Sequence, residues 1–263
     1  MKYVLVTGAY GGMGKAVVEQ LKSAGYYVFA LDLKCGIEEE NVMPIETDIT
    51  DENSVRKAYE KIKEITNELY AVLHFAGIYT LNSLVEIGEE NFKRIFEVNV
   101  FGVYRINKIF LPLLKKGSRV LITTSELAPL EPLPFTGLYA VTKSTLDKYA
   151  YSLRMELQLL GVKVIVLRPG AVKTGMLDVS TRDLDLFCEN TKYYSCNANR
   201  FKKIVESVES RHVTPKRIAR KSVKLIEKKR PKFVYSINRN PLLLLLNILP
   251  KRMQTWIIKQ VLK

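Results

Sequence analysis

Short apolar runs alternate with longer amphipathic stretches over roughly the first two thirds of the chain. The runs are apolar on both faces, which predicts strands buried between two layers of helices. The predicted strands cover residues 3–6, 27–31, 42–46, 70–75, 119–123 and 162–167. Helical periodicity covers residues 12–24, 51–67, 88–114 and 136–160. This alternation predicts an α/β fold with a doubly wound parallel sheet in a single domain.

A glycine-rich loop from Thr7 to Gly14 joins the first predicted strand to the first predicted helix. Glycines let the backbone approach a pyrophosphate, and the helix N-terminus stabilises its charge. The placement predicts a Rossmann-type dinucleotide site, with a ligand-free turn as the alternative. Asp32 ends the second strand, where a carboxylate would bind the adenosine ribose and repel a 2′-phosphate. We therefore expect NAD in preference to NADP, although Lys34 would offset part of the repulsion.

The fourth predicted helix places a phenol and an ammonium one turn apart, at Tyr139 and Lys143. A neighbouring cation lowers the pKa of a tyrosine, which makes Tyr139 a candidate general acid/base. Ser125 follows the fifth strand, at the sheet edge where its hydroxyl could bind a substrate oxygen. Many helices carry tyrosine and lysine at this spacing, so the pair alone also fits a purely structural interpretation.

Together these motifs resemble those of the short-chain dehydrogenase/reductase family, in its hydroxysteroid and retinol dehydrogenase-like branch. The resemblance covers roughly residues 2–175 and includes the sequences at 99–102 and 168–174. It implies that Tyr139 is the acid/base, that Lys143 lowers its pKa and binds the nicotinamide ribose, that Ser125 orients the substrate oxygen, and that Asn99 anchors a water. The implied cofactor contacts are Gly8, Tyr10, Gly12, Met13, Gly14, Asp32, Asp48, Ile49, Ala76, Gly77, Tyr139, Lys143, Pro169, Val172 and Thr174.

Two segments depart from the family pattern. His74 and Phe75 stand where the family usually has two asparagines, and the simplest interpretation of His74 is a buried, hydrogen-bonded strand residue. The segment from Ser125 to Tyr139 is about one residue longer than usual and contains three prolines. A shift of register there would make Thr124 the alternative to Ser125.

Residues 175–199 have the least regular pattern and are interpreted as a substrate loop that forms a lid. Apolar and aromatic side chains there and beside Ser125 predict a pocket for a lipophilic alcohol or ketone, such as a steroid or retinoid. The alternative is a loop that simply packs on the core. The predicted substrate contacts are Ser125, Tyr139, Leu133, Phe135, Met176 and Tyr193.

The net charge of +14 comes from the last quarter of the chain. Residues 1–199 contain 23 basic and 24 acidic side chains, whereas residues 200–263 contain 18 basic and 3 acidic ones. No recognition motif accompanies this charge, so we expect no nucleic-acid partner. Residues 236–263 are predicted to form a basic, amphipathic helical extension, too short in its apolar run to span a bilayer. The extension either makes peripheral contact with an anionic membrane or covers the pocket or a subunit interface.

The remaining features define the predicted function. The three cysteines lack metal-ligand spacing, so we expect reduced thiols and no metal. No signal-peptide pattern precedes the first strand, which predicts a cytoplasmic protein. The sequence predicts a catalytic domain over residues 1–235 that interconverts a secondary alcohol and a ketone with NAD(H), and the resemblance implies a homodimer or homotetramer. The alternatives are a reductase of small or acyl-linked ketones and a non-catalytic dinucleotide-sensing protein.

Overall fold

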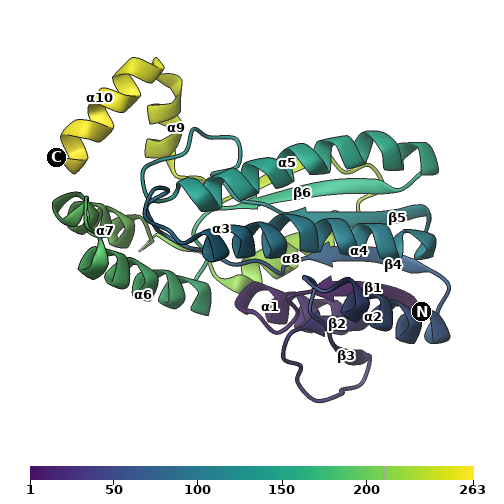
Figure 1. The fold of residues 1–263 in the computed structure, drawn as a ribbon. Coiled ribbons are helices and arrows are strands. Elements are labelled where there is room, and N and C mark those ends of the chain that lie inside the picture. Colours follow the sequence, from purple (N-terminus) through teal and green to yellow (C-terminus); the bar gives the residue numbers. More distant parts are fainter. Residues whose placement is uncertain (210) are drawn as a thin grey trace.

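The computed structural model describes residues 1–209 and 211–263, with the backbone alone at 176–180, 208 and 209 (Figure 1). At its centre lies a seven-stranded sheet with the strand order β3-β2-β1-β4-β5-β6-β7, in which all neighbouring strands are parallel. This order confirms the doubly wound α/β fold. The strands are β1 (Lys2–Thr7), β2 (Tyr26–Asp32), β3 (Val42–Glu46), β4 (Leu69–His74), β5 (Leu114–Thr123), β6 (Lys163–Pro169) and β7 (Val234–Ile237).

Helices cover both faces of the sheet, which explains why the strands are apolar on both sides (Figure 1). In β1, Val4 and Val6 pack towards one helical layer and Leu5 towards the other. Successive side chains of a strand point to opposite faces, so this strand contributes to two cores. The first layer contains α1 (Gly12–Ser23) and α8 (Pro215–Glu227), and the second contains α2 (Glu52–Ile65), α4 (Gly102–Phe110) and α5 (Gly137–Leu157).

The single helix expected over residues 88–114 is interrupted in the structure. It consists of α3 (Glu89–Phe96), a π-helical turn (Glu97–Phe101), α4 and a 3₁₀ turn (Leu111–Leu113), and Leu114 already belongs to β5. The apolar periodicity continues through the π-helical turn, so the pattern gave no sign of it, whereas Pro112 lies in the 3₁₀ turn, near the expected end of the helix. A π-turn inside an α-helix often accompanies a functional site, and here it carries Asn99.

Four helices lie beyond the carboxyl ends of the strands: α6 (Gly175–Asn190), α7 (Ser195–Glu209), α9 (Pro241–Ile248) and α10 (Lys251–Leu262) (Figure 1). The loop expected over residues 175–199 is therefore largely helical. Its apolar side chains form a third cluster with Phe135 and with Leu262 of α10, outside the two cores of the sheet. The C-terminal extension is helical as predicted, but β7 continues past the domain boundary expected at residue 235.

None of the helices in the described parts of the chain is long and apolar enough to span a membrane.

Candidate active site

The glycine loop packs so closely against other backbone atoms that side chains do not fit at two of its positions. A Cβ atom on Gly14 would lie 1.9 Å from the carbonyl oxygen of Gly8, and one on Gly8 would lie 2.5 Å from the backbone nitrogen of Ala76. Gly8 also has a φ of +66°, which favours glycine. Helix α1 begins after Gly11 without a side-chain cap, so its first N–H groups are free to bind an anion such as a pyrophosphate.

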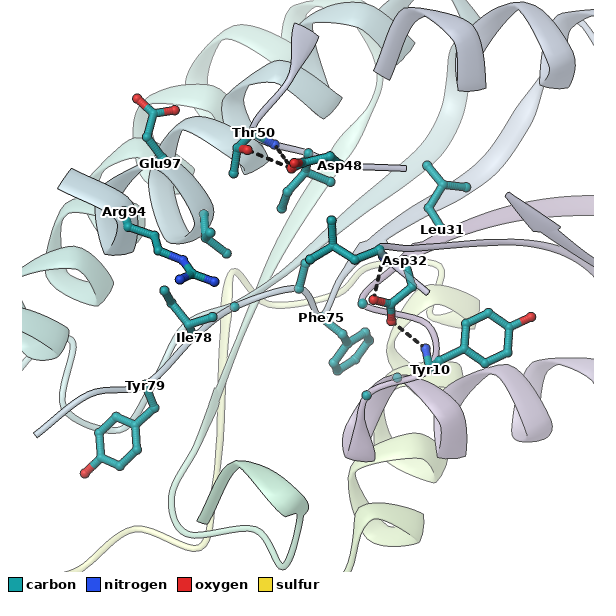
Figure 2. A pocket seen from close by; sticks show the side chains of 18 of the residues that line it. Tyr10, Leu31, Asp32, Asp48, Thr50, Phe75, Ile78, Tyr79, Arg94 and Glu97 are labelled. Atoms are coloured by element: carbon teal, nitrogen blue, oxygen red, sulfur yellow. Dashed lines mark hydrogen bonds between the residues drawn. The ribbon is translucent and has the colours of Figure 1, made fainter. Parts of the chain in front are cut away.

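Next to this loop lies a cavity of about 1180 Å³ at the carboxyl edge of the sheet (Figure 2). The cavity is large enough for a dinucleotide, since ligand pockets usually measure about 300–1,000 Å³. It brings together most of the predicted cofactor residues, namely Gly8, Tyr10, Gly12, Met13, Gly14, Asp32, Asp48, Ile49, Ala76, Gly77 and Thr174. The loop, the uncapped helix and this cavity fit a nicotinamide dinucleotide.

Two carboxylates of this cavity are held in place by hydrogen bonds. Asp32 accepts one from the backbone nitrogen of Tyr10 at 2.8 Å (Figure 2) and one from that of Leu33 at 2.8 Å. Asp48 accepts from the backbone nitrogen and the hydroxyl of Thr50, at 2.8 and 2.7 Å. The Asp32 carboxylate is therefore fixed between β2 and the glycine loop, where a ribose hydroxyl could reach it.

A smaller cavity of about 200 Å³ continues from the first one and shares Met13, Ala76, Gly77 and Thr174 with it. The predicted residues Leu133, Tyr139, Lys143, Pro169 and Val172 line this inner cavity. The inner cavity is thus the place where a nicotinamide and a substrate would meet.

Tyr139 is partly buried and lines this inner cavity. Burial raises the pKa of Tyr139 to about 12, while a hydrogen bond with Ser125 lowers it. Desolvation is thus the largest influence on the pKa of Tyr139 in this structure, and the lowering by Lys143 that the motif implies stays a prediction. The edge of the Tyr79 ring packs against the Tyr139 ring, with the centroids 4.6 Å apart. The phenol is consequently held in its protonated form.

Lys143 lies one turn after Tyr139, with Nζ 5.6 Å from the centre of the phenol ring. Its ammonium donates a hydrogen bond to the carbonyl oxygen of Thr123 at 3.3 Å. Burial lowers the pKa of Lys143 to about 8. A Cβ on Gly77 would stand 3.4 Å from this Nζ, so the small residue keeps the ammonium accessible from the cavity.

Asn99 is fully buried in the π-turn and links three segments of the site. Its Oδ1 accepts from the backbone nitrogen of Ile78 at 2.8 Å, and its Nδ2 donates to the carbonyl of Ile78 at 3.0 Å and to the Thr142 hydroxyl at 3.1 Å. Asn99 therefore fixes the segment after β4 against the helix that carries Tyr139. Its implied role as the anchor of a water stays a prediction.

Of the remaining predicted substrate contacts, the structure places two away from the inner cavity. Phe135 lies in the third cluster, against Phe187 and Phe201. Tyr193 is 74% exposed. The side chain of Met176 lies outside the described residues. Tyr193 lies between α6 and α7, and Phe135 packs against side chains of these two helices. Neither residue belongs to an open lid.

Several residues that line the inner cavity were not anticipated from the sequence. They are Glu126, Phe201, Ile204, Val205 and Leu243, of which the last lies on α9. Glu126 accepts a hydrogen bond from the backbone nitrogen of Asn240 at 2.6 Å, and burial raises its carboxyl pKa. Its position directly after Ser125 was the one available signal. The other four come from distant helices, and no local pattern connects them with the site.

His74 is buried at the end of β4, as expected from its strand position. Its Nε2 lies 2.9 Å from Oδ1 of Asn107, whose Nδ2 donates to the Tyr149 hydroxyl at 3.2 Å. Burial lowers the pKa of His74 to about 4. The imidazole is therefore neutral at pH 7, and its contact with Asn107 links β4 to α4.

Acidification is expected to destabilise the fold through His74. The unfolded histidine takes up a proton below its ordinary pKa of 6.5, whereas the folded one does so only near pH 4. Stability is therefore lost as the pH falls between these values, by about 3 kcal/mol in all. Urea unfolding of His74→Asn at about pH 7 and pH 4.5 should lack this part of the pH dependence. The matched variant at the exposed His212, His212→Gln, should retain it; equal pH dependence in the two variants would contradict the assignment.

The fold and the site together define a class of protein: an α/β dinucleotide-binding enzyme with tyrosine and lysine in a cavity at the carboxyl edge of the sheet and a serine, which follows β5, hydrogen-bonded to that tyrosine. A family model described as short chain dehydrogenase matches residues 2–185. The chain therefore belongs to the short-chain dehydrogenase/reductase family, whose members are oxidoreductases acting on CH–OH groups. This confirms the resemblance seen in the motifs.

Individual relatives extend the comparison. Estradiol 17-beta-dehydrogenase 2 of Mus musculus is 35% identical over 187 residues, which are 66% of this chain and 49% of that protein. The chain thus spans about half of the mouse relative. 3-Ketodihydrosphingosine reductase of Bacteroides thetaiotaomicron is 27% identical over 231 residues, 88% of this chain and 85% of that protein. A solved short chain dehydrogenase family protein from Francisella tularensis shares the fold, with a TM-score of 0.75, 24% identity, and coverage of 90% of this chain and 97% of the other.

Proposed function

We propose that the protein is an NAD(H)-dependent oxidoreductase that interconverts a secondary alcohol and a ketone by hydride transfer. The observation that carries the proposal is the position of Tyr139 and Lys143 in an inner cavity that continues from one of dinucleotide size. When bound, the nicotinamide would supply or accept the hydride. Tyr139, Lys143, Pro169, Val172 and Thr174 are the residues proposed to surround it.

Tyr139 is proposed to donate the proton that the substrate oxygen receives when a ketone is reduced. Reduction of a ketone leaves negative charge on its oxygen, and a positioned proton donor must neutralise it. A phenol kept protonated by burial is in the form that donates, and Ser125 shares a hydrogen bond with it. The ammonium of Lys143 stabilises the phenolate that remains. The same groups act in the opposite order when an alcohol is oxidised.

NAD is proposed as the cofactor because of Asp32. Its carboxylate is fixed at the end of β2 by the backbone nitrogens of Tyr10 and Leu33. A 2′-phosphate placed there would stand beside a like charge in a cavity partly removed from water, which is unfavourable. A ribose with free hydroxyls would instead donate hydrogen bonds to the carboxylate.

The substrate is proposed to be lipophilic, such as a hydroxysteroid. The inner cavity is lined mainly by apolar side chains, including Leu127, Leu133, Phe201, Ile204 and Leu243. The mouse relative is named for estradiol and the bacterial one for 3-ketodihydrosphingosine, both lipophilic molecules. A homodimer or homotetramer, a cytoplasmic location and a peripheral membrane contact of the C-terminus remain parts of the proposal.

A screen of alcohols tests the proposal. We expect NADH to accumulate when the protein is incubated with NAD and steroid or retinoid alcohols, measured by absorbance, at rates well above those with small secondary alcohols. Turnover of small or acyl-linked ketones alone would favour the alternative reductase. Tight NADH binding without turnover of any alcohol or ketone would indicate a dinucleotide-sensing protein and would contradict the proposed activity.

A further inference from the structure

We propose that α9 and α10 form a docking surface for anionic lipid membranes, and that the substrate cavity opens beside this surface. The docking itself depends only on the surface of the two helices. The second part, entry of substrate from the bilayer, rests on the proposed lipophilic substrate. Figure 1 shows both helices projecting beyond the carboxyl ends of the strands, away from α1 and α8.

Large apolar side chains are exposed on both helices. In α9, Leu242, Leu245 and Ile248 are 65%, 60% and 79% exposed. In α10, Met253 and Trp256 are 49% and 63% exposed. We call these five residues the docking face. A concentration of exposed apolar side chains on two consecutive helices is uncommon on a soluble surface and marks an interaction site.

The two helices are nevertheless held firmly by the body of the protein. The Asn197 side chain of α7 donates to the carbonyl of Leu262 at 2.6 Å, and Leu262 is buried in the third cluster. At the other end of the pair, the backbone nitrogen of Glu131 donates to Asn247 at 2.7 Å. The docking face is therefore the outer side of anchored helices and not the result of a detached tail.

The charge around the docking face indicates the kind of partner. Residues 239–263 contain five basic side chains, and no acidic residue follows Glu227 in the sequence: the basic residues are Arg239, Lys251, Arg252, Lys259 and Lys263. Basic residues near an anionic membrane each contribute about 1 kcal/mol to binding. Exposed leucines and a tryptophan beside lysines and arginines are typical of helices that lie in a membrane interface.

A second copy of the chain fits this surface less well. A two-fold symmetric interface brings the same patch of both copies together, so the basic side chains would face one another. Glu131 forms an ion pair with Lys251 at 3.0 Å, but no acidic side chain within residues 239–263 relieves the repulsion among the other four basic residues. Nucleic acid would satisfy the charge but not the aliphatic side chains, because bases bind by stacking on aromatic rings.

The dimensions of α9 favour a position in the interface. An eight-residue helix is about 12 Å long, far less than the roughly 30 Å of the hydrocarbon core. The helix would therefore lie in the interface with its exposed Leu242 and Leu245 in the acyl region. Trp256 suits the same depth, since its indole combines an apolar body with a polar N–H.

Helix α9 also contacts the substrate cavity. Leu243 lines the inner cavity, although the residue before it, Leu242, belongs to the docking face. The backbone nitrogen of Asn240, which caps α9, donates to Glu126, the residue after Ser125. One side of α9 thus borders the active site while the other would contact lipid. A lipophilic substrate dissolved in the bilayer would reach the cavity without crossing water.

Vesicle binding tests the docking surface directly. Trp256 is the single tryptophan of the chain, so its fluorescence reports on the docking face alone. With vesicles of phosphatidylcholine and phosphatidylserine at low salt, we expect a blue shift and co-flotation of the protein. Vesicles of phosphatidylcholine alone should bind at least about fivefold more weakly, the equivalent of one basic contact. No shift and no flotation with the anionic vesicles would overturn the proposal.

Variants separate lipid binding from self-association. Leu245→Ser together with Ile248→Ser should weaken vesicle binding at least about tenfold, since each buried side chain contributes about 1.5–3 kcal/mol. The control is Leu159→Ser, at a leucine that is even more exposed (83%) and lies outside the two helices. If the double variant instead dissociates an oligomer in size-exclusion chromatography and retains full vesicle binding, the surface is a subunit interface and the proposal is wrong.

Activity measurements test substrate entry. With a steroid alcohol dissolved in anionic vesicles, the Leu245→Ser/Ile248→Ser variant should show a KM raised at least about fivefold, while kcat and turnover of a water-soluble secondary alcohol remain unchanged. An unchanged KM would contradict entry from the bilayer. Vesicle binding without any dehydrogenase activity would contradict the proposed function but support the docking surface, so the two failures are distinguishable.

Discussion

Replacement of Tyr139 by phenylalanine is expected to lower kcat by about 10²–10⁴-fold while leaving NADH binding unchanged. A general acid or base commonly contributes this much to a rate, and phenylalanine retains the ring that packs edge-on against Tyr79. The substitution removes a single oxygen from the inner cavity. Steady-state kinetics with the best alcohol of the screen would measure the loss, and NADH fluorescence titration would measure cofactor affinity.

The control for this substitution lies on the same helix. Tyr151 belongs to α5 but is 56% exposed, and it does not line either cavity. Tyr151→Phe should therefore change kcat by less than about twofold. If Tyr139→Phe kept activity within this margin as well, Tyr139 would not be the acid/base, and the serine or an ordered water would have to carry the proton.

Replacement of Asp32 by asparagine is expected to shift the cofactor preference from NAD towards NADP by about 100-fold. Asparagine retains a carbonyl oxygen that can accept from the Tyr10 or Leu33 backbone nitrogen, but it removes the charge that opposes a 2′-phosphate. Like charges brought together at a binding site cost several kcal/mol, and a factor of ten corresponds to 1.4 kcal/mol. The ratio of kcat/KM with the two cofactors is the quantity to measure.

A second acidic residue provides the comparison for Asp32. Asp51 caps α2 with its side chain but does not line the cofactor cavity, and asparagine caps a helix about as well as aspartate. Asp51→Asn should leave the preference unchanged. If wild-type protein used NADP as efficiently as NAD, or if Asp32→Asn behaved like Asp51→Asn, Asp32 would not determine the cofactor.

The sheet could be predicted because its signal is local. Most residues of the six predicted strands are buried, and these strands are therefore largely apolar, whereas β7 has only four residues, of which just Ile237 is buried. The sequence pattern did not predict helices α6 and α7, and the cause is again the number of buried apolar positions. Their apolar side chains pack in a small third cluster away from the sheet, and this requires fewer apolar positions than a full helical stripe.

The residues of the candidate site likewise form two groups, those that local motifs could place and those that only the packing of distant segments reveals. Gly8, Asp32, Ser125 and Tyr139 lie on strand ends or on the helix after one, and parallel strands bring these ends to one edge. Contiguous motifs were therefore sufficient to place them. Leu243 and Phe201 reach the cavity from helices far along the chain, which only tertiary packing could reveal. The raised pKa of Tyr139 likewise depends on burial by distant residues.

The contact of Leu243 with the inner cavity makes the inner side of α9 part of the wall around the proposed catalytic residues. Water that entered past Leu243 would restore solvation to the phenol of Tyr139 and the ammonium of Lys143, whose pKa values are shifted by burial. Both values would then return towards those of the free side chains. The acid–base properties of residues 139 and 143 are therefore set partly by a segment about a hundred positions later in the chain.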